Sequence, residues 1–295
     1  MTCGLRRWMA PAVPLARVAV LRTIVHLFVL LDVAIVTPWA FSHGDTSTEL
    51  YHPVLLRRLL HLPAPSHDYV RVLLAVIVVS ALVAAGGRLP RLAGWTCCAA
   101  MLDWWSNAFS YSKVDHDHFA IVVALAVLPT VGRAGWRDRT PSEAAGWALR
   151  CVQVGVVATY FLSAVAKMRF GGWDWAAGAT FTWAFVRRGT GLAQLMLHWP
   201  WLVSASQWAL LGLEALSPLL LFVRGRLLYA GVAAFAGFHL TTWLLIRIHF
   251  LPLVVCLAAF LPLERLVPDR RAPRRVHGPA PEAAQTPAGQ ASASR

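Results

Sequence analysis

Long apolar stretches constrain this chain more than any other feature of its sequence. A helix needs roughly 20 apolar residues to cross the hydrocarbon core of a bilayer, which is about 30 Å thick, and shorter helices are tolerated inside a bundle. Residues 15–265 contain about eight candidate stretches. Only 14% of the 295 residues are charged and 58% are hydrophobic, whereas a soluble domain has about 25% charged residues. We therefore expect an integral membrane protein with the lipid bilayer around it, and no nucleic-acid partner despite the formal charge of +13.

The apolar stretches predict an all-α polytopic fold of about eight transmembrane helices. They lie at 15–37, 69–86, 92–110, 117–132, 148–166, 201–223, 227–246 and 249–264. The tryptophan-rich stretch 171–200 is broken by glycines, which favours an interfacial or re-entrant segment. We expect a cytoplasmic segment 1–14, a transmembrane helical domain 15–265 and a disordered tail 266–295 rich in proline, alanine and arginine.

The arginines between the spans predict the orientation. More of them fall on the side of the N-terminus than on the other side, and the positive-inside rule places that side in the cytoplasm. Eight spans then leave both termini in the cytoplasm of a multi-pass protein of the plasma membrane. One basic cluster remains outside, made up of Arg57, Arg58, Arg169, Arg187 and Arg188.

Lys167 is the most distinctive ionisable residue. Only two of the 27 lysines and arginines are lysines, Lys113 and Lys167, and Lys167 ends an apolar segment just before a tryptophan-rich turn. A desolvated lysine can lose its proton, whereas an arginine stays charged, so Lys167 is a candidate general base for an apolar substrate. The same position also suits a lysine whose amine reaches the membrane surface from a helix end.

Several further residues are expected to share an outward-facing pocket with Lys167, because the predicted topology brings their helix ends to one depth. His118 is the expected polar partner of the base. Its stretch KVDHDH (113–118) also suits a metal site, but no second histidine cluster supports one, and we expect no metal. The expected substrate contacts are Arg169, Trp173, Trp175, His239 and Arg247.

Charges inside the spans need partners, because each costs at least about 2.5–3.5 kcal/mol at the bilayer centre. Arg22 and Glu214 both fall inside predicted spans. We expect them to form a structural ion pair. A role for Glu214 in a proton relay remains the alternative.

The run YFLSAVAKMRFGGWDWAAGATFTWAF (160–185) resembles the Lys–Gly–Trp–Gly block of the HTTM (horizontally transferred transmembrane) family, the membrane part of vitamin K-dependent gamma-carboxylases. Arg22 in the first span, DHFAIVVALAVLPT (117–130) and FHLTTWLLIRIHF (238–250) are similar to further features of that family, in the same order. The resemblance covers roughly residues 15–265.

The resemblance implies that Lys167 deprotonates a hydroquinone and that His118 serves a later carboxylation step. Reduced vitamin K or menaquinol would be the ligand, with O2 and CO2 as co-reactants and an epoxide as product. Asp117 stands where the family has asparagine, and Arg169 lies in the link between lysine and tryptophan. Because the chain ends soon after the last apolar stretch, we expect no large propeptide-binding domain. We therefore expect oxidation or epoxidation of a quinol, and we consider peptide carboxylation doubtful.

Two other functions are compatible with the same residues. A non-enzymatic accessory protein for peptide maturation, export or immunity would use the outer basic cluster to contact a peptide or protein partner. A proton-coupled carrier would use Glu214 and His239 as a relay. The three functions make different predictions for variants of Lys167 and Glu214.

Overall fold

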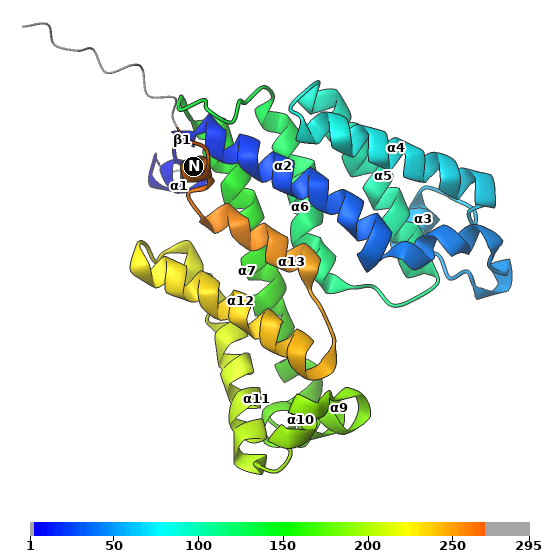
Figure 1. Cartoon of the computed structure of the whole chain (residues 1–295), viewed down its shortest axis with the longest axis vertical. Coiled ribbons are helices and arrows are strands. Elements are labelled where there is room, and N and C mark those ends of the chain that lie inside the picture. The colour runs from blue at the N-terminus through cyan, green and yellow to red at the C-terminus, as the bar shows by residue number, and fades with distance from the viewer. Residues whose placement is uncertain (1–2, 269–295) are drawn as a thin grey trace, which may run out of the picture.

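The computed structural model describes residues 3–268, and these are almost entirely helical (Figure 1). The longer helices are α2 (Leu15–Leu31), α4 (His67–Ala85), α5 (Pro90–Ser110), α6 (Phe119–Val131), α7 (Glu143–Gly171), α11 (Pro200–Ala215) and α12 (Arg226–Ile246). The shorter helices are α1 (Cys3–Met9), α3 (Leu55–Leu59), α8 (Asp174–Ala177), α9 (Thr180–Arg188), α10 (Gly191–Met196) and α13 (Leu251–Cys256). Two-residue strands β1 (Val13–Pro14) and β2 (Pro141–Ser142) pair antiparallel. Most of the predicted tail, from residue 269 on, lies outside the described residues.

Helices α2, α4, α5, α6, α13 and the first part of α7 pack into one bundle, the upper body in Figure 1. Its core contains Leu21, Ile77, Met101 and Ile121, none of which is accessible to solvent. Trp104 of α5 is equally buried, and its indole N–H donates to the hydroxyl of Thr37. Burying this much apolar surface is the dominant stabilising term of such a bundle.

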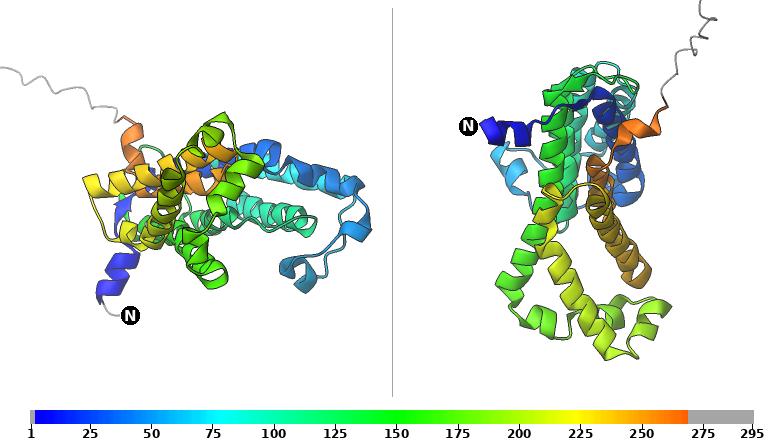
Figure 2. Two further views of the ribbon diagram at one scale, coloured as in Figure 1. Left: turned by 90° about the horizontal axis from the view of Figure 1, so that it is seen from below. Right: turned by 90° about the vertical axis from the view of Figure 1, so that its left-hand side faces the viewer.

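The segment from α8 to α11 projects away from the bundle, at the bottom of Figure 1 and in the right-hand view of Figure 2. Helix α7 leads into it and α11 returns beside α7 in the opposite direction. Two hydrogen bonds flank this antiparallel contact: the Gln207 amide of α11 donates to the Ala176 carbonyl of α8, and the hydroxyl of Ser217, just after α11, donates to the Val157 carbonyl of α7. Residues 171–200 form short helices at the end of the projection, and their place relative to the membrane stays a prediction.

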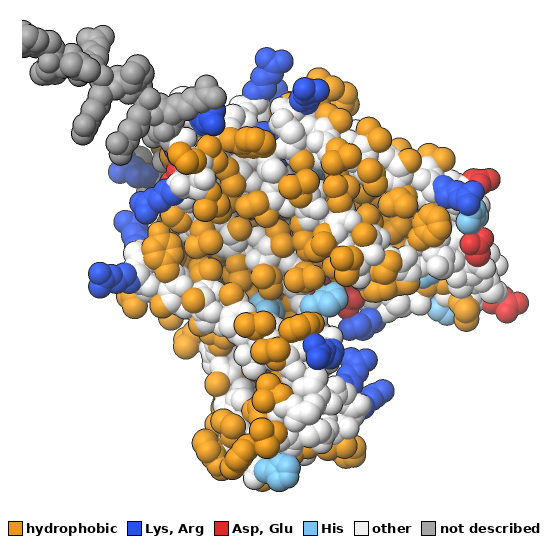
Figure 3. All heavy atoms as spheres, viewed as in Figure 1, with side chains coloured by type: hydrophobic (Ala, Val, Ile, Leu, Met, Phe, Trp, Pro, Cys, Tyr) orange, Lys and Arg blue, Asp and Glu red, His pale blue; other side chains and the backbone are white. Residues whose placement is uncertain are grey.

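Four helices are long and apolar enough to cross a membrane within the part of the chain that the structure describes. They are Leu15–Val36, His67–Ala85, Glu143–Gly171 and Arg226–Ile246. Helix α4 turns an apolar face outward, with Val72, Val79 and Leu82 more than half exposed, and Figure 3 shows hydrophobic side chains across the visible face of the bundle. A water-soluble surface rarely exposes so continuous an apolar area, so this face suits lipid.

The other four predicted spans are also helical but do not meet the same criteria. The segments His116–Val131 and Leu251–Phe260 are apolar and shorter. Helix α11 has 16 residues, and α5 carries polar side chains, among them Asp103, whose carboxylate pairs with the buried Arg57 at 2.5 Å. An all-α fold with four candidate spans follows, and the count of eight spans with both termini inside stays a prediction.

Candidate functional site

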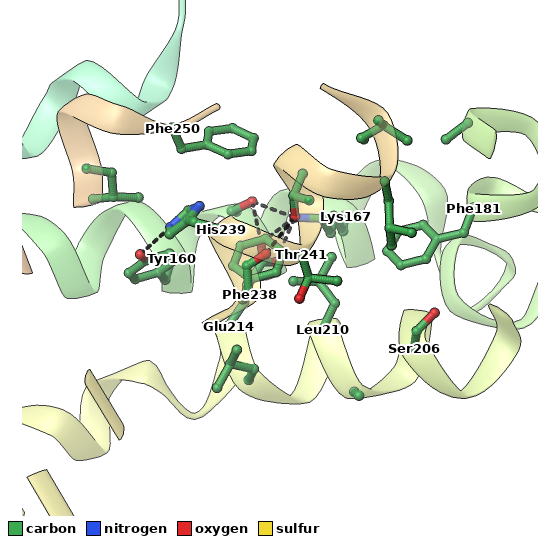
Figure 4. A pocket seen from close by; sticks show the side chains of 18 of the residues that line it. Tyr160, Lys167, Phe181, Ser206, Leu210, Glu214, Phe238, His239, Thr241 and Phe250 are labelled. Carbon is green, nitrogen blue, oxygen red and sulfur yellow. Dashed lines mark hydrogen bonds and ion pairs between the residues drawn. The ribbon is translucent and has the colours of Figure 1, made fainter. Parts of the chain in front are cut away.

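A cavity of about 430 Å³ lies between α7, α9, α11 and α12. Figure 4 shows its wall, which is mainly aromatic and aliphatic, with Phe181, Leu210, Phe238 and Phe250 among the lining side chains. The volume is within the range of about 300–1,000 Å³ typical of small-molecule sites. Polar side chains enter this apolar wall at two places, the first and second polar ends, and each of them joins α7 to another helix.

The first polar end is an ion pair between Lys167 of α7 and Glu214 of α11. The Lys167 Nζ donates to Glu214 Oε2 at 2.6 Å, to Oε1 at 2.8 Å and to Ser163 Oγ at 2.5 Å. The Nζ also lies 5.3 Å from the centre of the Trp175 ring. Ser163 lies one helical turn before Lys167, so the two side chains share a face of α7.

This pairing changes the chemistry expected of Lys167. An ammonium has three N–H donors, and Glu214 and Ser163 accept all three, so the amine has a carboxylate beside it that the sequence did not predict. The pair carries no net charge, which lowers the cost of burying its members. A bound hydroxyl can transfer its proton to Glu214, while the Lys167 ammonium stabilises the oxyanion that forms.

The second polar end joins His239 of α12 to Tyr160 of α7. The Tyr160 hydroxyl and His239 Nε2 are 2.6 Å apart, and the rings of Phe238 and Phe250 flank the imidazole with centroids 4.7 and 5.2 Å away. When the hydroxyl donates to Nε2, the neutral ring carries its proton on Nδ1. That Nδ1 is buried and has no hydrogen-bond partner among residues 3–268, so it is free to donate to a ligand.

His118 does not join Lys167 in the cavity. It lies in the bundle, where its Nε2 is 3.2 Å from Asp32 Oδ2 and its Nδ1 is 3.1 Å from Asp117 Oδ1. Its neighbour His116 lines the cavity instead, with its ring 6.3 Å from that of Phe250. The 3-10 turn His116–His118 turns these two histidines to different surroundings.

The expected substrate contacts fall in three places. Trp175 and His239 line the cavity. Arg169 and Trp173 line a separate groove on the other side of the contact between α7 and α11. Arg247 caps α12 in a left-handed conformation, and its guanidinium lies 4.9 Å from the centre of the Trp243 ring.

The ion pair predicted between Arg22 and Glu214 is wrong. Arg22 is buried at the opposite end of the bundle, where it donates to the carbonyls of Gly132 and Ala134. Glu214 meets Lys167 because α11 runs antiparallel to α7. Backbone carbonyls thus take the place of a carboxylate as partners for the buried guanidinium.

Tyr160, Ser163 and His116 were not assigned to the site from the sequence, although all three line the cavity. Tyr160 and Ser163 precede Lys167 by seven and four residues, the spacing that places side chains on one face of a helix, so this face could have been predicted. His116 could not, because only the packed turn decides which histidine of DHDH enters the cavity. Among the described residues, no group of three or more histidine, cysteine or acidic side chains is placed to hold a metal ion.

Comparisons of the chain with protein-family models, with curated proteins and with solved structures found no match. The site is therefore defined by its own geometry. It is an apolar cavity with two polar ends, in an all-α protein with four candidate membrane spans. These features are compatible with a helical membrane protein, and the cavity has the size and the mainly apolar lining typical of small-molecule sites.

Proposed function

We propose that this chain is a membrane protein of the HTTM type that binds a quinol-like, lipid-soluble ligand in the cavity and accepts a proton from it. One observation carries the proposal: the Lys167–Glu214 pair, with Glu214 buried and Lys167 partly buried, lies in a wall that is mainly apolar. Aromatic side chains favour a flat ring. A buried hydroxyl on that ring needs polar partners, which the pair supplies.

The proposed step is a proton transfer at the first polar end. The O–H bond of the ligand breaks, the proton moves to a carboxylate oxygen of Glu214, and the negative charge stays on the ligand oxygen. Lys167 keeps its charge and stabilises that oxygen. Glu214 therefore acts as the immediate proton acceptor, and the general-base function first assigned to Lys167 belongs to the pair.

The second polar end would orient the ligand. The free Nδ1–H of His239 can donate to a second oxygen on the far side of the ring, and Tyr160 holds the imidazole in the required tautomer. His116, on the cavity wall, takes the place proposed for His118. A molecule with oxygens on two sides of a flat ring matches this arrangement.

The wider setting follows the family resemblance. With eight spans and both termini in the cytoplasm, the cavity would open toward the outer face of the plasma membrane, where reduced vitamin K or menaquinol diffuses in the bilayer. O2 would oxidise the deprotonated quinol to an epoxide, with one oxygen atom of O2 entering the ring and the other leaving as hydroxide. CO2 addition to a peptide glutamate, with a peptide partner on the outer face, would be a further step of the same chemistry.

The test is turnover of a reduced menaquinone by the full chain in nanodiscs, with oxygen present and the epoxide measured by mass spectrometry. Lys167→Met and Glu214→Gln should each lower the rate at least about 100-fold, the usual contribution of a positioned acid or base. Lys113→Met is the matched control, because the Lys113 side chain is 87% exposed and should leave the rate unchanged. Undiminished epoxide formation by Lys167→Met would refute the proposal.

Proton-coupled transport is the second candidate, favoured by the placement of Glu214 and His239 in one cavity. A carrier would show flux driven by a pH gradient in proteoliposomes, lost in Glu214→Gln, and no epoxide. The accessory function has less support, since Arg57 of the outer basic cluster is buried and paired with Asp103.

A further inference from the structure

A second hollow lies beside the cavity and shares none of its residues. It is a groove of about 540 Å³ between α7 and α11, lined by Phe161, Ala164, Val165, Met168, Arg169, Trp173, Leu211 and Ala215. Arg169 and Trp173 belong to the tryptophan-rich motif, and the proposed function does not use them. The groove and the cavity lie on the two sides of the seam between these helices.

The groove has a polar end and an apolar end. Arg169 and Trp173 line the polar end, and the Trp173 ring stacks on that of Trp208, with centroids 5.9 Å apart and an interplanar angle of 27°. At the other end, Phe161, Val165 and Ala215 provide only apolar atoms. Because α7 and α11 are antiparallel, the part of α7 that carries Phe161 and the end of α11 that carries Ala215 both lie at the apolar end of the groove.

The length of the groove matches one leaflet of a bilayer. From Arg169 to Phe161 the chain makes eight residues of α-helix, about 12 Å at 1.5 Å per residue. Half of a hydrocarbon core of about 30 Å is about 15 Å. With Arg169 and the stacked tryptophans at headgroup depth, where tryptophan is enriched, the apolar end reaches nearly to the middle of the bilayer.

Charge favours an anionic occupant. Arg169 is exposed and makes no ion pair with any acidic residue of the described chain; its guanidinium lies 5.5 Å from the centre of the Phe170 ring. A cation at headgroup depth without an acidic partner attracts phosphate. Phe161 and Val165 are 40% and 42% exposed, so the groove is open to an acyl chain from the side.

We propose that this groove binds one anionic phospholipid of the outer leaflet, with an acyl chain along Phe161, Val165 and Ala215 and the phosphate at Arg169. The site is independent of the quinol proposal, because it uses none of the residues of the cavity. The stacked tryptophans cover the glycerol region of the lipid.

The experiment uses the purified full chain in detergent with phosphatidylglycerol that carries a photoactivatable group on its acyl chain. Irradiation should label peptides that contain residues 161–168 or 211–215. Unlabelled phosphatidylglycerol should compete about fivefold better than phosphatidylcholine, since one arginine near the membrane surface contributes about 1 kcal/mol toward anionic lipid.

Two variants and a matched control separate the contributions. Arg169→Gln should abolish the preference for phosphatidylglycerol, and Ala215→Phe, at an exposed position of the groove, should reduce labelling by filling it. Arg187→Gln removes a cation from the same projecting segment outside the groove and should change neither. Any of three results would overturn the proposal. The two lipids could compete equally well for the natural chain, the preference for phosphatidylglycerol could survive in Arg169→Gln, or glycerol phosphate alone could compete as strongly as the lipid.

Discussion

Replacing Lys167 by methionine should destabilise the folded chain by about 3 kcal/mol, because it leaves a buried carboxylate without its partner. Breaking a buried ion pair from one side costs about 3–5 kcal/mol. The lower end applies here, since the Lys167 side chain is 19% exposed while that of Glu214 is only 6% exposed. The carboxylate would keep one hydrogen bond, from the Ser163 hydroxyl at 3.3 Å.

The double variant Lys167→Met/Glu214→Leu provides the decisive comparison. Replacing both members of a buried pair by apolar side chains of similar size is often close to neutral. We therefore expect the double variant to be more stable than Lys167→Met alone, although it carries one more substitution. A strongly non-additive cycle of this kind is the mark of a direct interaction.

The free energy of unfolding can be measured by SDS titration in mixed micelles, with tryptophan fluorescence as the signal. Lys113→Met serves as the control and should stay within about 0.5 kcal/mol of the natural chain, as surface substitutions do. If the double variant is destabilised by the sum of the two single effects, Lys167 and Glu214 do not stabilise each other. The ion pair on which the site is built would then be refuted.

Three further predictions address other parts of the molecule. Tyr160→Phe removes the hydroxyl partner of His239 and should weaken quinol binding about tenfold by equilibrium titration, an energy typical of one lost buried hydrogen bond; unchanged affinity would exclude an orienting function. Gly146→Ala should prevent accumulation of folded protein, judged by size-exclusion chromatography, because its Cβ would collide with the Pro11 carbonyl; a normal yield would contradict the close approach. Burial lowers the pKa of His43 below its usual 6.5, so the unfolded chain takes up a proton at His43 at a higher pH than the folded chain does, and the free energy of unfolding should fall as the pH drops below about 6.5. His43→Gln should reduce this pH dependence in SDS titrations at pH 7 and pH 5. An unchanged pH dependence would mean that other groups cause it.

The helices themselves could be predicted from local sequence. Each of the eight apolar stretches contains a helix, because a backbone surrounded by apolar side chains in lipid must satisfy its own hydrogen bonds. Helix α5 shows where this reasoning weakens. Its Asp103, Ser106 and Asn107 face partners inside the protein, so average hydropathy underestimates how well the helix is buried.

The site was predictable only in part. Lys167 was noticed because it is one of only two lysines among the 27 lysines and arginines, and the structure places it on the wall of the cavity. The partner of Glu214 was predicted wrongly, because the choice between Arg22 and Lys167 depends on which helix packs against α11. The same limit explains why His118 was chosen where His116 lines the cavity.

Composition and periodicity alone determined that this chain is an all-α protein with apolar helices suited to a membrane, because the bilayer imposes one solution on every apolar stretch. Only the tertiary structure decided which polar groups meet. Pairing of buried charges depends on distances of a few ångströms between residues far apart in the chain, as between Lys167 and Glu214, 47 positions apart. Helix direction and packing set those distances, and no local pattern records them.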